Sequence, residues 1–476
     1  MREVIRLQWI LFLSFFILFS SFDQGNKPPT KELQYYLNHI SILTKQGGKW
    51  KTPNREYKPE DEWSRSHYGY EYSKGISEYY LKLKITAYYP NKMQWYVLTD
   101  GYYTWDFKNN RVNYHSYTPN GTFASGYSLK LTEEGMTLSF TITSIDGKQI
   151  QYKETETFND TSIVAQNSER KGRKWEIKQA SQWSRQIMPP ANLKIVYNAV
   201  IDKTCGTYEI FSMNLDGSDK RNISNWKGAD WAYATFGDKI YFVSDRDTTS
   251  RLWFLYEMDV NGNNVRKVFN QRLEDSYIGI NSVGSKMILK PIRKERNTFL
   301  IIDITKGVVI DSLILPFAGI ADPIYLNGDK QIVFRGNKVK KEPEELFIMD
   351  ANGTNIKQLT KYPSSDTTAK WYETHTGTPV WNEKEKALTY FSKQNSNHSI
   401  YSIKLDGTDQ RKLTDDLFNE GWHAWTKDGN FLVYDGSDLE DKNFDIYLKD
   451  VQSGFIKRLT TDSIVEQAPL FIQSKK

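Results

Sequence analysis

The chain has almost no cysteine: its 476 residues include one, Cys205. No intramolecular disulfide can form, and a cysteine-based metal site is excluded. We expect Cys205 to be a small buried or loop residue. The sequence also lacks a Gly-x-Ser-x-Gly nucleophile elbow and a glycine-rich phosphate loop between a strand and a helix. These absences exclude a serine hydrolase built on an α/β domain and give no support to nucleotide binding.

The chain also has no marked excess of positive or negative charge. The 63 basic residues stand against 58 acidic ones, which leaves a net charge of only +5, and no arginine-rich stripe is visible. A nucleic-acid-binding surface requires a concentrated basic patch. We therefore expect no nucleic-acid partner.

A long apolar run is found at the N-terminus. Residues 9–19 read WILFLSFFILF, with Arg2 and Arg6 before the run and two serines after it. A basic start, a short apolar stretch and small residues are typical of a secretory signal peptide. The run is short for a membrane helix, which needs about 20 apolar residues. We predict a signal peptide at 1–22, a periplasmic or secreted location and no stable membrane span after cleavage; an uncleaved anchor is the alternative.

Aromatic residues are abundant, at 14% of the chain, which favours strands over helices. From residue 193 onward, apolar strands end in polar turns whose glycines recur at nearly constant spacing. These turn glycines are Gly217, Gly262, Gly307, Gly353, Gly407 and Gly454, at intervals of 45, 45, 46, 54 and 47 residues. A period of about 40 to 50 residues in an all-β sequence indicates the blades of a β-propeller.

Each repeat holds a second hairpin upstream of the first, as in FGDKIYFVSD (236–245) and KDGNFLVYD (427–435), so each repeat has four strands. Such a sheet has two bare edges and an apolar face, and blades must therefore stack around an axis. The first repeat begins with LKIVYN (193–198) and no inner strand, whereas APLFI (468–472) is an inner strand with no blade after it. We predict that the C-terminal strand completes the first blade and closes a six-bladed propeller.

The region before the propeller has a different pattern. Residues 30–46 place apolar side chains at helical spacing, and two glycines end the pattern. From Lys49 onward the side chains alternate, with hairpins expected about Asp146-Gly147 and near Gly172. We expect an antiparallel sheet of seven to ten strands that forms a barrel or half of one. The predicted fold class is all-β: an N-terminal antiparallel β-barrel-like domain with an N-terminal helix (30–187), a linker at MPPAN (188–192) and a propeller of four-stranded blades (193–476).

Parts of the repeats resemble the propeller repeat of the TolB family. The matching stretches are SDR (244–246), MDANG (349–353), TPVWN (378–382) and LDG (405–407). The resemblance implies a six-bladed propeller and, as for TolB itself, a periplasmic partner of outer-membrane proteins. Similar propellers also precede hydrolase domains or carry lyase sites, so the resemblance indicates the fold and does not decide the function.

The sequence GKW at 48–50, ahead of strands rich in Tyr and Trp, resembles the lipocalin-like barrels of bacterial secreted proteins. That resemblance implies a barrel which, if closed, could enclose a cavity for an apolar ligand. The alternative is a filled barrel that acts as a spacer.

Long, variable segments alternate with the tight turns of the repeats, and the topology of a blade places them together on one face. Variable loops on a rigid scaffold are the usual arrangement for binding. The aromatic residues in or near these segments are Trp226, Trp231, Trp371, Tyr372 and Trp422. Aromatic side chains at a wet rim suit protein or carbohydrate contacts; packing between blades is the alternative.

Histidine is scarce, with six residues, but two of them are expected at the same mouth of the propeller channel. His375 lies in the segment 361–377 that lengthens one interval, and His423 stands where other inner strands have proline. A hydrolytic zinc usually needs three protein ligands, and Glu373 or Asp230 could supply the third. We favour structural histidines and predict no metal and no cofactor.

The sequence thus predicts an exported, monomeric, non-enzymatic binding protein whose loop-rich propeller face holds a protein or a glycan. Two alternatives are open: a metal-assisted enzyme of the polysaccharide-lyase type in the propeller funnel, and a carrier of a small apolar ligand in the N-terminal barrel. The predicted binding residues are Asp230, Trp231, Trp371, Tyr372, His375, Trp422 and His423.

Overall fold

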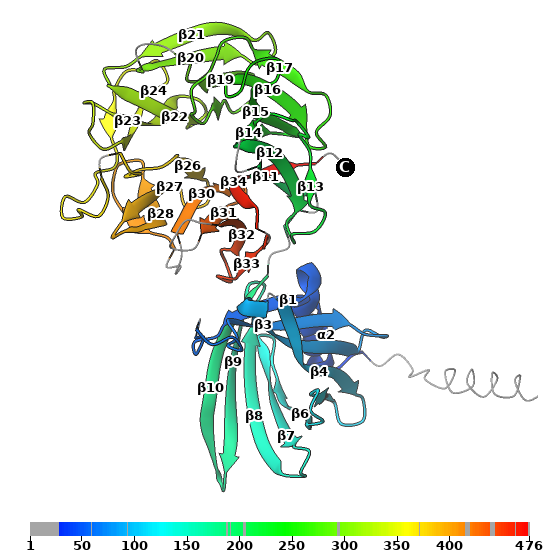
Figure 1. Ribbon diagram of the computed structural model, residues 1–476. Coiled ribbons are helices and arrows are strands. Elements are labelled where there is room, and N and C mark those ends of the chain that lie inside the picture. The colour runs from blue at the N-terminus through cyan, green and yellow to red at the C-terminus, as the bar shows by residue number, and fades with distance from the viewer. Residues whose placement is uncertain are drawn as a thin grey trace, which may run out of the picture. The chain divides into compact units, whose positions relative to one another are not determined.

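The structure is a computed structural model that describes residues 28–474, apart from 59, 93, 187–188, 191, 203–205, 293–295, 371, 415–418, 438–442 and 462. The predicted signal peptide (1–22), Cys205 and Trp371 lie outside the described residues. Two compact units are present (Figure 1). One holds 68–87, 95–185 and the N-terminal segment up to Thr52, and the other holds 53–67, 88–94 and the chain from Gln186 onward. In the described part of the chain, no helix combines the length and the apolarity that crossing a membrane requires.

The first unit contains a closed barrel of ten strands, each antiparallel to its neighbours. The strands are β1 (Lys49–Pro53), β2 (His67–Lys74), β3 (Tyr80–Tyr89), β4 (Gln94–Asp106), β5 (Arg111–Tyr117), β6 (Phe123–Leu131), β7 (Gly135–Thr143), β8 (Gln149–Phe158), β9 (Ser162–Lys171) and β10 (Lys174–Arg185). Side chains alternate between the interior and the solvent: on β3, Leu81 and Leu83 are buried while Lys82 is exposed. The predicted hairpin turns are present at Gly147 and Gly172, where φ is +79° and +61°. The predicted barrel is therefore closed, and its ten strands are the upper limit of the predicted range of seven to ten.

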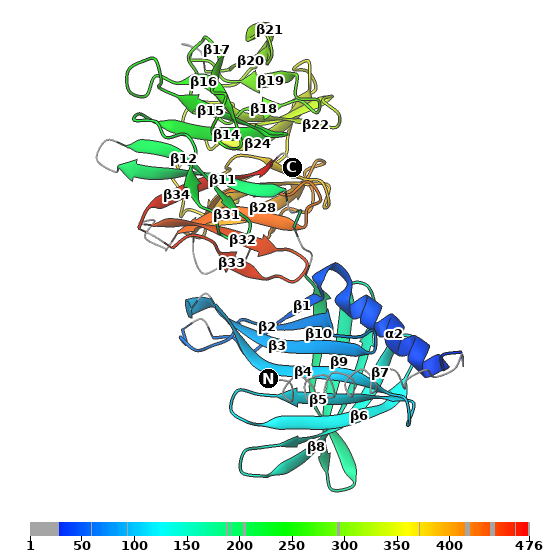
Figure 2. The same ribbon diagram turned by 90° about the vertical axis from the view of Figure 1, so that its right-hand side faces the viewer.

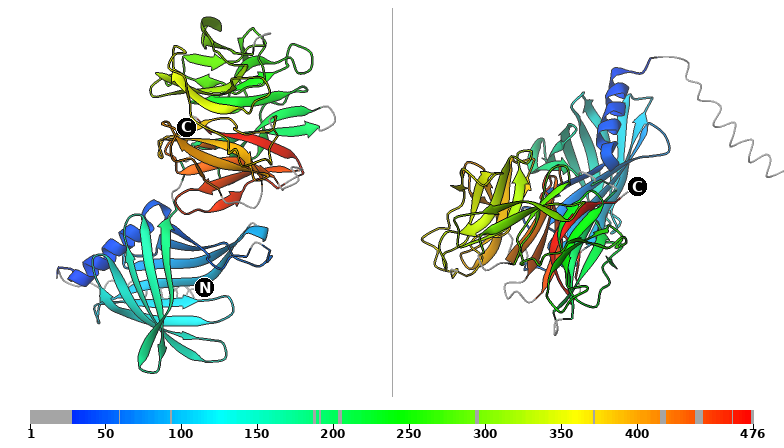
Figure 3. Two further views of the ribbon diagram at one scale, coloured as in Figure 1. Left: turned by 90° about the vertical axis from the view of Figure 1, so that its left-hand side faces the viewer. Right: turned by 90° about the horizontal axis from the view of Figure 1, so that it is seen from above.

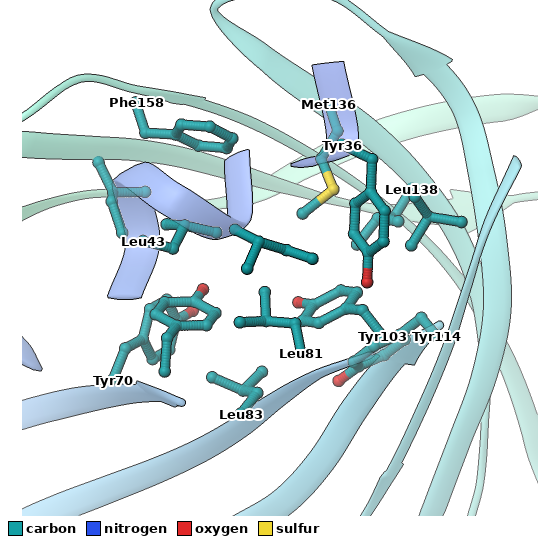
Figure 4. Packing of buried hydrophobic residues seen from close by; sticks show 14 of the residues in the cluster. Tyr36, Leu43, Tyr70, Leu81, Leu83, Tyr103, Tyr114, Met136, Leu138 and Phe158 are labelled. Carbon is teal, nitrogen blue, oxygen red and sulfur yellow. The ribbon is translucent and has the colours of Figure 1, made fainter. Parts of the chain in front are cut away.

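Helix α2 (Lys31–Thr44) packs against the inward side chains of the barrel and confirms the helix expected at 30–46. Thr30 caps its first turn by accepting a hydrogen bond from the backbone N–H of Leu33 at 3.2 Å. Figure 2 shows the helix beside the strands, and Figure 4 shows its Tyr36 and Leu43 among side chains of the barrel core. Part of the barrel interior is therefore filled by the helix.

Arg185, the last residue of β10, ties this helix to the seam where β10 pairs with β1. Its guanidinium lies over Trp50, with Cζ 4.0 Å from the ring centroid, and donates to the carbonyl oxygens of Ile42 and Lys45 at 2.6 Å each. The carbonyl of Ile42 also accepts the backbone N–H of Lys45, and that of Lys45 accepts the N–H of Gly48, so Arg185 is a second donor to each of these carbonyls at the end of the helix. Because Arg185 is 2% exposed, its buried charge depends on these partners.

A lysine at position 185 would keep the charge, but its compact ammonium could neither lie flat on Trp50 nor reproduce the planar, spread-out donors with which Arg185 reaches both carbonyls. We expect Arg185→Lys to lower the free energy of unfolding by about 2 kcal/mol, measured by urea denaturation. The matched control is Arg173→Lys in the exposed β9–β10 turn, for which we expect a change within about 0.5 kcal/mol. Equal stability of the two variants would contradict the role given to Arg185.

The second unit contains six four-stranded antiparallel sheets, which are the predicted six blades of a β-propeller. In Figure 1 the inner strands β14, β22, β26, β30 and β34 surround the axis, and Figure 3 shows the blades from two further directions. From the inner to the outer strand, the blades are blade 1 (β34, β11, β12, β13), blade 2 (β14 to β17), blade 3 (β18 to β21), blade 4 (β22 to β25), blade 5 (β26 to β29) and blade 6 (β30 to β33).

The propeller strands have the following bounds. They are β11 (Leu193–Asp202), β12 (Thr207–Asn214), β13 (Arg221–Asn222), β14 (Asp230–Phe236), β15 (Lys239–Ser244), β16 (Phe254–Asp259), β17 (Arg266–Phe269), β18 (Gly279–Ile280), β19 (Lys286–Leu289), β20 (Thr298–Asp303), β21 (Val308–Ile314), β22 (Gly319–Leu326), β23 (Gln331–Asn337), β24 (Glu345–Asp350), β25 (Lys357–Gln358), β26 (Val380–Asn382), β27 (Ala387–Gln394), β28 (Asn397–Lys404), β29 (Arg411–Lys412), β30 (Asn419–Trp425), β31 (Phe431–Ser437), β32 (Phe444–Asp450), β33 (Ile456–Arg458) and β34 (Val465–Gln473).

Each pair of neighbouring blades shares its own hydrophobic core, and six such cores complete the ring. Side chains alternate along a strand, so that one set faces the preceding blade and the other set faces the following blade. On β11, Ile195 and Tyr197 pack against blade 6, whereas Val196 packs against blade 2. Because both faces of a blade are buried, its middle strands read as continuous apolar runs.

A serine or threonine follows the outer strand in several of the repeats, and its hydroxyl group has a structural role. Thr360, just beyond the outer strand of blade 4, accepts a hydrogen bond from the backbone N–H of Leu346 at 2.8 Å and donates to the carboxylate of Glu345 at 2.6 Å. Ser224 makes the corresponding two contacts in blade 1. The hydroxyl thus joins the end of the outer strand to the start of the third strand, which explains its recurrence in the repeat.

The ring is closed by β34, which pairs antiparallel with β11 and places Phe471 opposite Ile195. This confirms that the C-terminal strand completes the first blade. Ile472 is 2% exposed in the core between blades 1 and 2. Toward blade 6, the carboxylate of Asp435 accepts a hydrogen bond from the backbone N–H of Ala468 at 2.7 Å. One strand therefore holds both neighbours of blade 1.

We expect deletion of 466–476 to expose the edge of β11 and to cause aggregation or a large loss of stability. The loss of Ile472 alone should cost about 2 to 5 kcal/mol, and each kcal/mol lowers the Tm of a unit of this size by about 2 to 4 °C. Scanning calorimetry and size-exclusion chromatography measure both effects, with a chain that lacks only 475–476 as the control. A truncated chain that stays monomeric with an unchanged Tm would show that closure is dispensable.

Candidate functional site

The connections between strands fall on two faces of the propeller. In blades 2 to 6 the antiparallel order places the turn between the first and second strands and the turn between the third and fourth strands at one face, and in blade 1 the turn between β12 and β13 lies at the same face. The other connections lie at the opposite face, which we call the loop face. They include the long segments 245–253, 338–344 and 359–379. The observed topology therefore gathers the long segments on one face, as the sequence predicted.

Two of the predicted binding residues, Trp231 and Trp422, meet at the loop-face end of the inner strands. Trp231 lies on β14 and Trp422 on β30, and their ring centroids are 6.0 Å apart with the planes at 71°. Tyr208 packs edge-on against Trp231 at 4.8 Å, and Phe391 packs against Trp422 at 5.7 Å. All four rings are half-buried. We call these four residues the aromatic row.

The aromatic row joins blades that are not all neighbours. Trp231 belongs to blade 2 and Trp422 to blade 6, so blade 1 stands between them. The two indoles therefore reach toward each other across blade 1, whose inner strand carries the small Ala468 in the position that Trp422 occupies on β30. Tyr208 comes from blade 1 and Phe391 from blade 5. The row thus takes one ring from each of four consecutive blades.

Asp435, on β31, fixes the backbone under the aromatic row. Its carboxylate accepts hydrogen bonds from the backbone N–H groups of Ala468, at 2.7 Å, and of Trp422. Burial raises the pKa of Asp435 to about 8, and the two N–H donors act in the opposite direction. Gly421 is required beside it, because an added Cβ would lie 2.1 Å from Oδ1 of Asp435. Sequence reasoning did not single out Asp435; the available signal was an acidic residue at the end of an apolar strand.

A second polar cluster, also missed by sequence reasoning, lies on blades 2 to 4. Arg335 donates to Asp322 at 2.9 Å, and Asp322 also accepts from the backbone N–H of Tyr277 at 2.9 Å. The hydroxyl of Tyr233 donates to Asp275, and the ring of Tyr233 lies 4.9 Å from that of Tyr277. The signal in the sequence was again a charged residue, Arg335, at the end of an apolar second strand. The buried charges of Arg335 and Asp322 are paired with each other.

Asp230 is buried in an ion pair and has a structural role; its carboxylate is not exposed to a ligand. Its side chain is 0% exposed and forms an ion pair with Arg246, which belongs to the SDR stretch. Burial raises the pKa of Asp230, and the ion pair with Arg246 opposes this effect. Cζ of Arg246 lies 5.2 Å from the ring centroid of Trp226. The pair therefore holds the base of the segment after β15 against the segment that precedes β14.

The connection 359–379 carries three of the predicted site residues. Tyr372 is 63% exposed, with Nζ of Lys370 5.7 Å from its ring centroid. Its neighbour Trp371 lies outside the described residues. His375 is buried: its ring packs edge-on against Tyr362 at 4.1 Å, and its Nδ1 lies 3.0 Å from the carbonyl oxygen of Glu373.

His423 is also buried, within blades 5 and 6. Its Nε2 lies 2.8 Å from Oγ1 of Thr389, and that oxygen accepts a hydrogen bond from Nε1 of Trp425 at 2.9 Å. This arrangement fits a neutral imidazole whose Nε2 accepts the hydroxyl proton of Thr389. The lone pair that a metal would need is then engaged. His375 and His423 contact different residues, and the described residues hold no group of three or more His, Cys, Asp and Glu side chains that could bind a metal ion.

Burial lowers the pKa of His423 from 6.5 to about 4. As the pH falls from 7 to 4, the unfolded chain takes up this proton before the folded chain does, so the folded state loses stability over that window. We expect the free energy of unfolding of the unaltered protein to fall by about 3 kcal/mol relative to His423→Gln between pH 7 and pH 4.

Chemical denaturation at a series of pH values measures this difference, because titrations shared by the two proteins cancel. The difference should stay constant between pH 7 and pH 8, where His423 is neutral in both states. A difference that is the same at pH 4 and pH 7 would mean that the imidazole is solvated in the folded protein.

Comparisons with known proteins bear on the propeller. No family model matches the chain. The Tol-Pal system protein TolB of Wolinella succinogenes is 25% identical over 135 residues, which is 27% of this chain and 29% of that protein. The match thus spans less than a third of the relative's length. Among solved structures, TolB from Acinetobacter baumannii has a TM-score of 0.48 at 12% identity, over 73% of this chain and 82% of that one.

A solved structure of another kind, an oligogalacturonate lyase in complex with manganese, has a TM-score of 0.37 at 15% identity, over 62% of this chain and 84% of that one. The resemblance that the repeats show to TolB is confirmed in sequence by the curated relative. The chain therefore carries a TolB-like six-bladed propeller, and a closed ten-stranded barrel precedes it.

Proposed function

We propose that the chain is an exported, non-enzymatic binding protein and that the loop face of its propeller holds a protein partner. The observation that carries this proposal is the aromatic row, in which half-buried rings from four blades lie in contact at one face. These rings offer apolar area on strands that are already ordered, so covering them costs little side-chain entropy. Tyr and Trp are also the residues that most often dominate the energy of protein interfaces.

The charges near the row favour a partner that covers aromatic area over one that neutralises a net charge. Asp230 is paired with Arg246, and Asp322 is paired with Arg335. A partner would therefore bury the ring edges at the centre and leave paired charges around them, which is the usual anatomy of a protein interface. The curated relative is named as a protein of the Tol-Pal system, which further favours a protein partner. A glycan stacked on the same rings is the alternative.

The histidines support a binding role over a metal-assisted lyase. A lyase of that type would need imidazole nitrogens directed at a shared metal. Here Nε2 of His423 is engaged by Thr389, and Nδ1 of His375 faces the carbonyl oxygen of Glu373. The signal-peptide-like N-terminus favours a periplasmic or secreted location, and we expect the protein to act as a monomer.

Site-specific photocrosslinking tests the proposal and requires no assumption about which protein the partner is. We expect p-benzoylphenylalanine in place of Trp422 to yield a protein adduct in cells of the source organism, identified by mass spectrometry. With the identified protein purified, Trp422→Ala and Trp231→Ala should each weaken binding by about 30-fold, the usual effect of losing an interface hot spot.

Trp381 supplies the matched control, because it is a half-buried tryptophan next to a turn at the other face, where its Nε1 donates to Glu383 at 2.7 Å. The crosslinker at position 381 should give no such adduct, and Trp381→Ala should leave the affinity unchanged. A carbohydrate adduct at position 422 would show that the partner is a glycan and not a protein. Equal yields at positions 422 and 381 would contradict a binding site at the loop face.

A further inference from the structure

The barrel interior is not filled throughout. Helix α2 packs one part of the core, but a cavity of about 210 Å³ remains between side chains of the strands. One wall of this cavity is aromatic and consists of Tyr70, Tyr103, Tyr114 and Phe140. The polar lining comprises Glu154 and Glu156 of β8, Asn167 of β9 and the hydroxyl residues Thr99, Ser116, Thr118 and Thr122. A cavity of this volume can hold a molecule about the size of a substituted benzene.

Among the described residues, the two glutamates have no cationic partner. They are two residues apart on one strand, so both side chains point into the barrel. Glu156 is 1% exposed, and its Oε2 has no hydrogen-bond partner among the described residues. The same holds for Oδ1 of Asn167, which stands opposite Glu154 in the β8–β9 ladder. Among the described residues that line the cavity there is no Lys, Arg or His.

Burial favours the protonated form of this pair. It raises the pKa of both glutamates, and the charge of Glu154 raises the pKa of Glu156 further. The other titratable groups around the pair are phenols, and burial raises the pKa of each of them as well; they are Tyr70, Tyr72, Tyr103 and Tyr114. The cavity is therefore rich in acceptor oxygens, and its two carboxyl groups favour the protonated form as long as no cation lies beside them.

We propose that this cavity binds a small organic ammonium ion. The ammonium group would donate to the side-chain oxygens of Glu154, Glu156 and Asn167. The carbon skeleton would pack on the aromatic wall, where ring faces also attract a cation. Binding of the cation displaces a carboxyl proton to solvent and leaves a carboxylate–ammonium pair. An apolar ligand, which the lipocalin resemblance implies, would leave the buried Oε2 of Glu156 unpaired.

Isothermal titration calorimetry on the full chain tests the proposal at pH 7. The probe is 2-phenylethylamine, and its neutral counterpart of similar shape is 2-phenylethanol. We expect the amine to bind and the alcohol to bind about tenfold or more weakly, because hydrogen bonds to charged groups are the stronger ones. We also expect the measured heat to vary with the ionisation enthalpy of the buffer, because binding releases a proton.

Glu156→Gln separates the charge from the shape of the cavity. We expect it to weaken amine binding by about tenfold or more, to reduce the proton release and to leave the chain folded, since it removes a buried acid without changing its size. Glu176→Gln, at an exposed position on β10, is the control and should change none of these. Equal affinity for amine and alcohol, or amine binding that survives Glu156→Gln, would overturn the proposal. The proposal would also be overturned if none of 2-phenylethylamine, cyclohexylamine and spermidine bound to the folded chain.

Discussion

The propeller depends on the pairing of β34 with β11. These strands come from opposite ends of the propeller sequence, and their ladder removes the free edges that a linear stack of six sheets would leave. A chain with one cysteine has no intramolecular disulfide to hold such a ring together. Residues of β34 also pack into both cores that flank blade 1. The loss of this one strand would therefore open two cores together with the ladder.

The candidate binding site follows from the same closure. Trp231 and Trp422 come from the two neighbours of blade 1, so their rings can lie 6.0 Å apart only when blade 1 is complete between them. Asp435 strengthens the connection, because its carboxylate accepts from the backbone of both Trp422 and Ala468. The rings are thus carried by inner strands and held by backbone contacts. Changes in the long connections would alter what surrounds the aromatic row without moving the rings themselves.

The period of the repeats made the propeller predictable. Each blade is a local unit with its own turns, so the glycine spacing at Gly217 and Gly262 and the unpaired strands at 193–198 and 468–472 were enough to predict six blades and their closure. The contact between Trp231 and Trp422 could not be predicted from the repeat period, because the two residues belong to blades that are separated by a third blade. A local pattern contains no such distance.

His423 and the barrel glutamates show two further limits of the sequence. A histidine in the place of a proline was expected to line the channel, but its two nitrogens need partners, and Thr389 of the adjacent blade supplies one inside the fold. The stretch KETETF in β8 has the alternation of a strand with one polar face. Whether Glu154 and Glu156 or the residues between them face the interior depends on the register of the whole barrel, since a shift by one residue exchanges the two faces.

Buried acids occur in both units, but the groups that surround them differ. This difference in surroundings distinguishes acids that stabilise the fold from acids that could bind a ligand. In the propeller, Asp230 has Arg246, Asp322 has Arg335, and Asp435 has two backbone N–H groups. In the barrel, Glu154 and Glu156 share their surroundings with each other, an amide and phenols. Burying a charged acid without a cation beside it costs several kcal/mol. Glu154 has Asn167 and Glu156 as hydrogen-bond partners, but Oε2 of Glu156 has none among the described residues, so a ligand that enters the cavity could supply the missing donor. Asp230 and Asp322 are neutralised by the fold itself, and Asp435 has backbone donors although its Oδ1 has no hydrogen-bond partner among the described residues. The barrel pair differs in lining a cavity that a ligand could enter.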